Sequence, residues 1–194
     1  MLLRCGVKAE PETEDAQAIV ASTSAWVERV VIGLGLCPFA KAVQSKGQVR
    51  YVLSQAETTQ ALLDDLKTEL LALSAADATR VDTTLLIHPR VLGDFLDYND
   101  FLSEADALLD ELQLDGVLQI ASFHPDYCFA DSAPDDPANL TNRSPYPLLH
   151  LLREASVTRA LETLAEPSAI YERNIQTLRA MDPEARARLF ERKR

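Results

Sequence analysis

The side chains best suited to chemistry near the start of this chain surround a cysteine. Cys37 stands directly before Pro38, and the residues after it favour a short helix, because proline suits the first turn of a helix. The dipole at a helix start favours a thiolate, so Cys37 is a candidate nucleophile that Lys41 and Arg50 could assist. The alternative is a thiol packed in the core, since a free cysteine behaves as a small hydrophobe.

Histidines supply candidate proton carriers at the ends of two predicted strands. His124 precedes Pro125, as His88 precedes Pro89. The two histidines would lie side by side at one edge of a sheet if their strands are neighbours. We predict His124 as a catalytic proton carrier, although the His-Pro steps would equally serve to end two strands.

A third histidine lies in a segment with helical spacing. His150 and Glu154 are four residues apart, so they would share one face of a helix over residues 147–165. Together with His124, and with Asp126 or His88 as a further ligand, they could bind a divalent cation. No ligand spacing typical of a metal site is present, so we predict no metal. We predict His150 as a second proton carrier, and Asp126 and Glu154 as ligand-binding residues.

The stretch between residues 122 and 146 is the clearest sign of a functional region. It holds four of the ten prolines, with a fifth directly after it at Pro147, and matches neither helical nor strand periodicity. Loops in compact domains are usually short, and long ordered ones tend to be functional. Proline lowers the entropy that such a loop loses on folding, so we predict an ordered loop.

An anion site is predicted where this loop ends. A helix starting near Pro147 would offer free backbone N–H groups, and the guanidinium of Arg143 would add a positive charge. We therefore predict that Arg143 clamps a phosphate or carboxylate, with Arg50, Asn139 and Asn142 as further ligand-binding residues. The alternative is that these side chains fix the loop to the body of the protein, with Arg143 paired to a neighbouring aspartate.

The overall charge and composition exclude several classes of partner. The chain has 194 residues and a formal net charge of −11, which disfavours binding to nucleic acid or to an anionic membrane. No stretch approaches the roughly 20 apolar residues of a membrane span, and the first residues lack a signal-peptide core, so we expect a cytoplasmic protein. Three scattered cysteines are too few for a disulfide framework. Composition leaves the oligomeric state open.

The order of predicted elements indicates an α/β fold, or an α+β one, with a sheet of about three strands in a βαβαβ core. We predict a flexible tail over residues 1–13 and a single domain over 14–194, in which N-terminal and C-terminal helices flank the core. The strands are predicted at 49–54, 83–89 and 116–125, and the helices between them at 57–75 and 97–113. The long loop leaves the sheet from the edge where α/β proteins usually bind ligands.

Three long blocks of the chain resemble one bacterial family. They are WVERVVIGLGLCPFAKA (26–42), the stretch from TTLLIHP to DFLDYNDFL (83–102) and FHPDYCFADSAPDDPANLTNRSPYPLLHLLREASV (123–157). These blocks are similar to domain-of-unknown-function family 1415, and the resemblance extends over residues 14–180. The resemblance implies no reaction, no cofactor and no catalytic residue.

These features favour an enzyme that acts on a small anionic metabolite in a polar pocket at the sheet edge. Its walls would be the 122–146 loop, the turn at Cys37 and the start of the helix at 147. The sequence has no Walker A, GxGxxG or GxSxG motif, so reaction and cofactor stay unassigned. The alternative is a non-catalytic binding or structural protein whose rigid loop and helical surface dock a partner. That alternative predicts a loop with satisfied polar groups and an exposed apolar patch, whereas an enzyme predicts a pocket that gathers the named residues.

Overall fold

A mixed sheet organises the part of the chain that the structure describes. The computed structural model describes residues 16–162 and 169–190, which form an α/β fold; the predicted tail lies outside these ranges. The strand order is β1-β2-β4-β3, in which β1 and β2 run parallel and β4 runs antiparallel to both of its neighbours. The strands are β1 (Val49–Leu53), β2 (Thr83–Ile87), β3 (Leu118–Phe123) and β4 (Leu148–Arg153).

The prediction of a helix beginning near Pro147 is wrong, because the residues after it form β4. β4 lies between β2 and β3, and its leucines face buried clusters on both sides of the sheet. A strand buried on both faces reads as a continuous apolar run, so periodicity could not distinguish it from a buried helix. The sheet therefore has four strands instead of the predicted three, and the helix α5 (Glu154–Leu161) begins only after β4.

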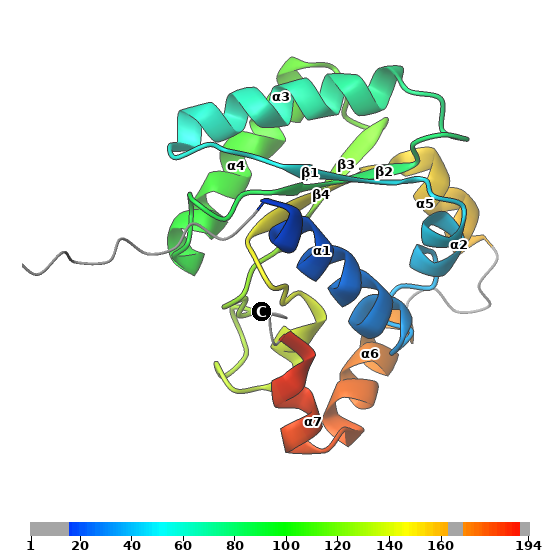
Figure 1. Cartoon of the computed structure of the whole chain (residues 1–194), viewed down its shortest axis with the longest axis vertical. Helices are drawn as coiled ribbons and strands as arrows, with labels where there is room; N and C mark the ends of the chain where they lie inside the picture. Colours follow the sequence, from blue (N-terminus) through cyan, green and yellow to red (C-terminus); the bar gives the residue numbers. More distant parts are fainter. Residues whose placement is uncertain (1–15, 163–168, 191–194) are drawn as a thin grey trace, which may run out of the picture.

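Two long amphipathic helices cover one face of the sheet. α3 (Thr59–Ala75) and α4 (Phe95–Glu111) pack there against the apolar side chains of the strands, on the opposite side of the sheet from α1 (Figure 1). The side chain of Thr58 caps α3 by accepting a hydrogen bond from the Ala61 N–H at 3.2 Å. Arg153 of β4 ends the same helix by donating to the Ala76 carbonyl at 2.6 Å. These contacts fix α3 at both ends.

A helix with an irregular turn covers the opposite face. α1 (Ala16–Trp26) continues directly into the π-helix η1 (Val27–Ile32). Such wide turns are rare and occur frequently at functional sites. A Cβ atom at Gly33 would lie 2.2 Å from the Arg29 carbonyl oxygen, so this turn requires glycine. The glycine that interrupts the helical pattern in the sequence therefore has a structural cause.

The predicted long loop is ordered and supports the C-terminal helices. It runs from the end of β3 to the start of β4 and contains one 3-10 turn, η2 (Pro137–Thr141), against which α6 (Ala169–Ala180) packs. After α6 the chain breaks before Pro183 and continues as α7 (Pro183–Ala187) and η3 (Arg188–Phe190). Figure 1 shows the loop, α6 and α7 grouped on the side of the sheet that carries α1.

Candidate functional site

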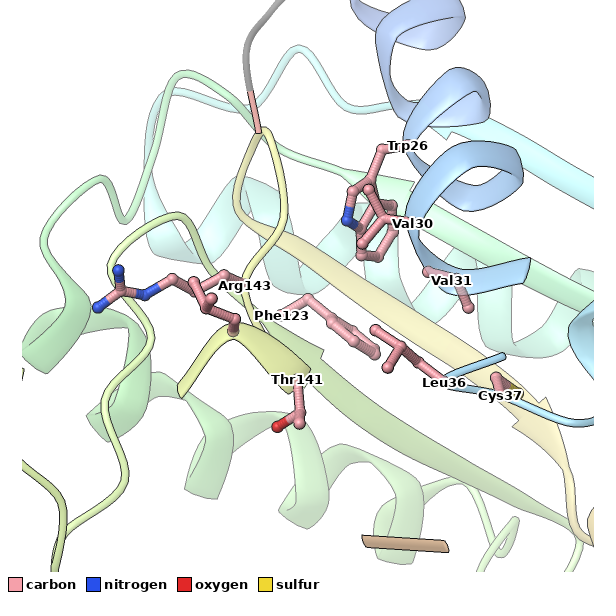
Figure 2. Close-up of a pocket in the computed structure, with 9 residues that line it drawn as sticks. Trp26, Val30, Val31, Leu36, Cys37, Phe123, Thr141 and Arg143 are labelled. Carbon is pink, nitrogen blue, oxygen red and sulfur yellow. The ribbon is translucent and has the colours of Figure 1, made fainter. Parts of the chain in front are cut away.

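Two adjoining hollows lie between the sheet face under α1, the long loop and the C-terminal helices. The first, here the inner hollow, has a volume of about 70 Å³ and walls that are mostly apolar (Figure 2). It is enclosed by η1, the turn after it, the end of β3 and the loop. Its lining residues are Trp26, Val30, Val31, Leu36, Cys37, Phe123, Leu140, Thr141 and Arg143.

The second, here the outer hollow, is larger and charged. Its volume of about 330 Å³ is in the range of small-molecule sites. Leu140 and Arg143 line both hollows, so the two adjoin. Asp136 in its wall is paired with Arg179 at 3.1 Å. The other charged residues of this wall are Asp135, Arg143 and Arg186. The lining residues are Asp135, Asp136, Pro137, Leu140, Arg143, Pro183, Arg186, Ala187 and Phe190.

Trp26 brings a buried hydrogen-bond donor to the inner hollow. The residue is 4% exposed, and its Nε1 has no hydrogen-bond partner among the described residues. The indole packs edge-on against the ring of Phe123, with 5.6 Å between the centroids. Figure 2 shows the indole nitrogen on the edge of the ring that is turned towards Arg143. Because buried donors are nearly always paired, this N–H indicates where an atom of a ligand or a water would bind.

Cys37 lies on the wall of the inner hollow, in the turn before the short helix α2 (Ala40–Ser45). Burial raises the pKa of its thiol, and this effect outweighs the backbone N–H groups of Phe39 and Ala40, which favour the thiolate. The N–H groups at the helix start therefore lower the pKa of the thiol, as expected, but burial raises it by more. At neutral pH Cys37 is a protonated thiol that packs in the wall.

Arg143 supports the loop and also lines both hollows. Its Nε donates to the Tyr127 carbonyl at 3.1 Å, and its Nη2 donates to the Pro134 carbonyl at 2.9 Å. It thus ties the two limbs of the loop together through backbone carbonyls, whereas Asp136 pairs with Arg179. In Figure 2 the guanidinium points away from the residues around the inner hollow. An anion would therefore reach this group from the outer hollow.

The amide side chains predicted to bind a ligand make hydrogen bonds to the backbone of the loop and of β3. Asn139 is fully buried, and its Oδ1 accepts from the Phe129 N–H at 3.0 Å while its Nδ2 donates to the Ala133 carbonyl at 2.8 Å. Asn142 donates to the Ser122 carbonyl at 3.1 Å and so holds the loop to the end of β3. Neither residue lines a hollow. For these two residues, the structure shows the loop-fixing contacts of the alternative interpretation.

His88 and His124 lie at the same edge of the sheet, although β4 separates their strands. β2 and β3 are both antiparallel to β4, so their carboxyl ends meet at one edge. Both histidines are fully buried and pack against the ring of Tyr98, with centroid distances of 5.7 Å and 5.1 Å. Burial lowers the pKa of both imidazoles, to about 4 for His88. Both rings are therefore neutral near pH 7.

The contacts of His124 leave neither ring nitrogen free. Its Nδ1 accepts from the backbone N–H of Asp126 at 3.0 Å, and its Nε2 lies 3.2 Å from the Leu92 carbonyl. Asp126 thus contributes its backbone to this arrangement, while the residue itself is exposed. Neither His124 nor Asp126 lines a hollow.

His150 and Glu154 do not share a helix face, because β4 ends between them. His150 lies on the sheet face that carries α1, where its Nε2 is 2.7 Å from the Thr83 hydroxyl and its ring is 6.2 Å from that of Phe123. Burial lowers its pKa to about 4. Glu154 is the first residue of α5. His150 therefore contacts a wall residue of the inner hollow without lining the hollow itself.

Arg50 lies outside both hollows. It pairs with Glu69 of α3 at 3.0 Å, on the sheet face opposite to α1. Glu69 is buried, and this burial raises the pKa of its carboxyl despite the adjacent guanidinium. Arg50 therefore serves an ion pair between strand and helix, and its predicted contribution to Cys37 has no geometric support.

The described residues contain neither a metal-binding cluster nor a membrane-spanning helix. Within residues 16–162 and 169–190, no three histidine, cysteine, aspartate or glutamate side chains come close enough together to hold a metal ion. None of the helices in these ranges has the length and apolar content needed to cross a bilayer.

Sequence reasoning missed the lining residues outside the predicted walls, among them Trp26 and Arg186. Trp26 follows the helical apolar spacing of its segment, which by itself indicates a core residue. An available signal was its position shortly before the two glycines of the GLG interruption. For Arg186 the signal was the basic run ARARLFERKR in an otherwise acidic chain.

Comparison with known proteins relates this chain to one family. A model of the family described as protein of unknown function (DUF1415) matches residues 18–188, which include every residue around the inner hollow. The chain belongs to this family. The match confirms the resemblance of the three sequence blocks. No curated protein and no solved structure matches the chain.

Proposed function

We propose that this protein binds a small amphipathic anion, with the apolar end in the inner hollow and the anionic group at the outer one. The observation that carries the proposal is that Leu140 and Arg143 line both hollows, so an apolar enclosure adjoins a charged one. Guanidinium groups bind carboxylates and phosphates through charge-assisted hydrogen bonds. A short-chain carboxylate or a phosphate monoester meets both requirements.

The volumes limit the size of the ligand. The inner hollow, at about 70 Å³, has roughly half the volume of the ~150 Å³ cavity that binds benzene in another protein. It therefore suits an apolar group of a few heavy atoms. The outer hollow, at about 330 Å³, has room for an anionic group together with its hydrating water.

Local charge has to attract the anion, because the whole chain carries a formal net charge of −11. Arg143 and Arg186 supply that charge at the outer hollow. Exposed charges interact over a distance of about 8 Å at physiological salt, so the long-range repulsion is largely screened. We therefore expect affinity to fall as salt concentration rises, because the contacts with both guanidinium groups are partly exposed to solvent.

Binding is better supported than catalysis. Cys37, His124 and His150 lie apart, and of these only Cys37 lines a hollow, as a thiol whose pKa burial raises. A general base must come within hydrogen-bond reach of the proton that it removes. The catalytic roles stay predictions that alkylation can test. In a variant that keeps Cys37 as its single cysteine, we expect iodoacetamide to react more slowly near pH 7 than with a free peptide thiol, and a faster reaction would restore the nucleophile hypothesis.

The rival role in docking a protein partner has less support. It predicts an exposed apolar patch, but the large exposed apolar side chains of the described residues are dispersed over different elements. These side chains are Leu71, Leu96, Val117 and Tyr171.

Fluorescence of Trp26 tests the proposal directly. It is the single tryptophan of the chain and lines the inner hollow, so its emission reports on the occupant. Titration with hexanoate should change the emission saturably. Inorganic phosphate, which has no apolar end, should bind about tenfold more weakly, because burying even two methylene groups contributes more than 1.4 kcal/mol.

Two arginine variants supply the matched control. Arg186→Ala should weaken hexanoate binding about fivefold to tenfold, because it removes one charge-assisted hydrogen bond without touching the loop contacts. Arg159→Ala, on the exposed surface of α5, should leave the affinity unchanged. An equal loss of affinity in both variants would show that net charge alone controls binding. The absence of any saturable signal in the wild-type protein would refute the proposed function.

A further inference from the structure

We infer that the ligand carries an oxygen acceptor within its apolar part and that Trp26 selects for that oxygen. This inference rests on the proposed function, because it concerns the occupant of the inner hollow. It goes further in naming the chemical class, which is a short carboxylate or phosphate ester with a carbonyl or ether oxygen in its carbon chain. The hydrogen bonds made by the polar side chains around the inner hollow indicate this class of ligand.

Two further polar side chains of the inner wall are paired with backbone carbonyls, and the Cys37 thiol in that wall is only a weak donor. The Thr141 hydroxyl lies 2.8 Å from the Ala138 carbonyl, and the Arg143 guanidinium donates to two loop carbonyls. Among the described residues, Trp26 Nε1 has no partner, although the residue is 4% exposed. The indole N–H is thus the strong donor that this wall offers to an occupant.

An unpaired buried donor discriminates between ligands of equal size. A purely apolar group that displaced water from the inner hollow would leave the N–H without an acceptor, which is unfavourable. A ligand with an oxygen at the right place would pair with it and keep the same apolar contacts. Sites that hydrogen-bond a ligand atom reject analogues that lack this atom more strongly than apolar pockets reject a missing methylene.

The fold holds this donor in a defined direction. Trp26 is the last residue of α1, directly before the π-helix, and its ring packs edge-on against Phe123 at 5.6 Å. Gly33 is required by the same turn, since a Cβ there would meet the Arg29 carbonyl oxygen. A rigidly held donor recognises the position of an acceptor as well as its presence. Trp26 is therefore placed as a specificity-determining residue.

Matched pairs of carboxylates test the inference by calorimetry. 4-Oxopentanoate and 4-methylpentanoate have the same number of heavy atoms and differ in a keto oxygen against a methyl group. The wild-type protein should bind the keto acid about fivefold to tenfold more tightly. Trp26→Phe keeps an aromatic ring without the N–H, so it should bind both acids with similar affinity. The pair 5-oxohexanoate and 5-methylhexanoate repeats the comparison with the oxygen one carbon further from the carboxylate.

Nuclear magnetic resonance provides a second measurement that needs no variant. Since the chain has one tryptophan, the ¹⁵N-labelled protein gives one indole N–H signal. A keto acid should shift this signal downfield and remove any contact with water, whereas the methyl analogue should not shift it downfield.

Each outcome has a separate meaning. If the wild-type protein binds both acids of each pair equally, the inference is wrong and the proposed function stands. A water molecule that stays on the indole N–H in the complex also overturns it. If no acid binds, the proposed function fails together with the inference.

Discussion

The two faces of the sheet are packed in different ways. On the face covered by α3 and α4, Leu62, Leu66 and Leu70 have no exposed surface and belong to one cluster with Leu149 and Leu151 of β4. On the other face the cover is a helix with a π turn, a long loop and short C-terminal helices, and the inner hollow lies among them.

This difference in packing suggests that one face of the sheet mainly stabilises the fold, whereas the other face provides the candidate site. Long regular helices fill the grooves of a sheet at high density, and every methylene there contributes to stability. An irregular cover leaves space, which costs packing energy but creates a site. We therefore expect substitutions on the α3 and α4 face to affect stability, and those around the hollows to affect binding.

Shortening a leucine on each face should give the largest contrast. Leu66→Ala, in the cluster under α3, should lower the free energy of unfolding by about 2–5 kcal/mol. Leu140→Ala, on the common wall of the hollows, should cost at most about 1 kcal/mol, because its surroundings are already incompletely filled. Urea denaturation measures both, and equal losses would remove the proposed distinction between the faces.

Acid should destabilise the protein through its buried histidines. His88 is fully buried beside Tyr98, and its pKa falls from an ordinary 6.5 to about 4 in the folded protein. The unfolded chain binds the proton first, so the stabilisation is complete above pH 6.5 and is lost as the pH falls towards 4. For His88 this amounts to about 3 kcal/mol, and His150 acts in the same direction.

Urea melts between pH 7 and 4 measure this loss, and a variant identifies its origin. His88→Phe keeps a ring on Tyr98 without a titrating group, so its stability should fall less steeply over this range. An unchanged slope would assign the acid sensitivity to other groups.

A methyl group at Gly33, directly after the π-helix, should disturb only the packing on the sheet face covered by α1. Gly33→Ala should cost about 1–3 kcal/mol, as overpacking does, and should weaken ligand binding, because the new Cβ would meet the Arg29 carbonyl oxygen at 2.2 Å. Gly93→Ala is the matched control, since a Cβ there has no neighbour within 4 Å. Thermal melts and tryptophan emission of both variants check the effect, and similar behaviour of the two would contradict the need for glycine at Gly33.

Removal of the loop strut should have only a modest effect on global stability. Arg143→Ala loses two partly exposed hydrogen bonds to loop carbonyls, so we expect a loss of about 1–2 kcal/mol and faster proteolysis within residues 128–142. Arg186→Ala should stay within about 0.5 kcal/mol of the wild-type protein. Unchanged proteolysis of the Arg143 variant would show that the loop holds its shape without this residue.

The regular parts of the fold were predictable from local sequence. α3 and α4 have the apolar spacing of amphipathic helices, and β1, β2 and β3 stand between clear turn signals, so the predicted spans agree with the structure. β4 was not predictable in this way, because burial on both faces depends on its central place in the sheet. That place results from pairing with strands distant in the sequence.

Parts of the site were predictable for reasons of local chemistry. Cys37 before a proline and Arg143 in the proline-rich loop do line the hollows. Asn139 and Asn142 do not, because a long ordered loop uses polar side chains to pair its own backbone groups. The edge-on contact between Trp26 of α1 and Phe123 of β3 joins distant parts of the chain, and no local pattern in the sequence encodes that contact.

The position of β4 has a consequence for biosynthesis. The strand comes last along the chain but lies between β2 and β3, so a nascent chain that ends before Leu148 leaves β3 without a pairing partner and β2 with an open edge. Unpaired strand edges promote aggregation, and pairing between distant segments slows folding. The sheet can therefore close only once β4 has left the ribosome, and until then these strand edges remain open to other pairing.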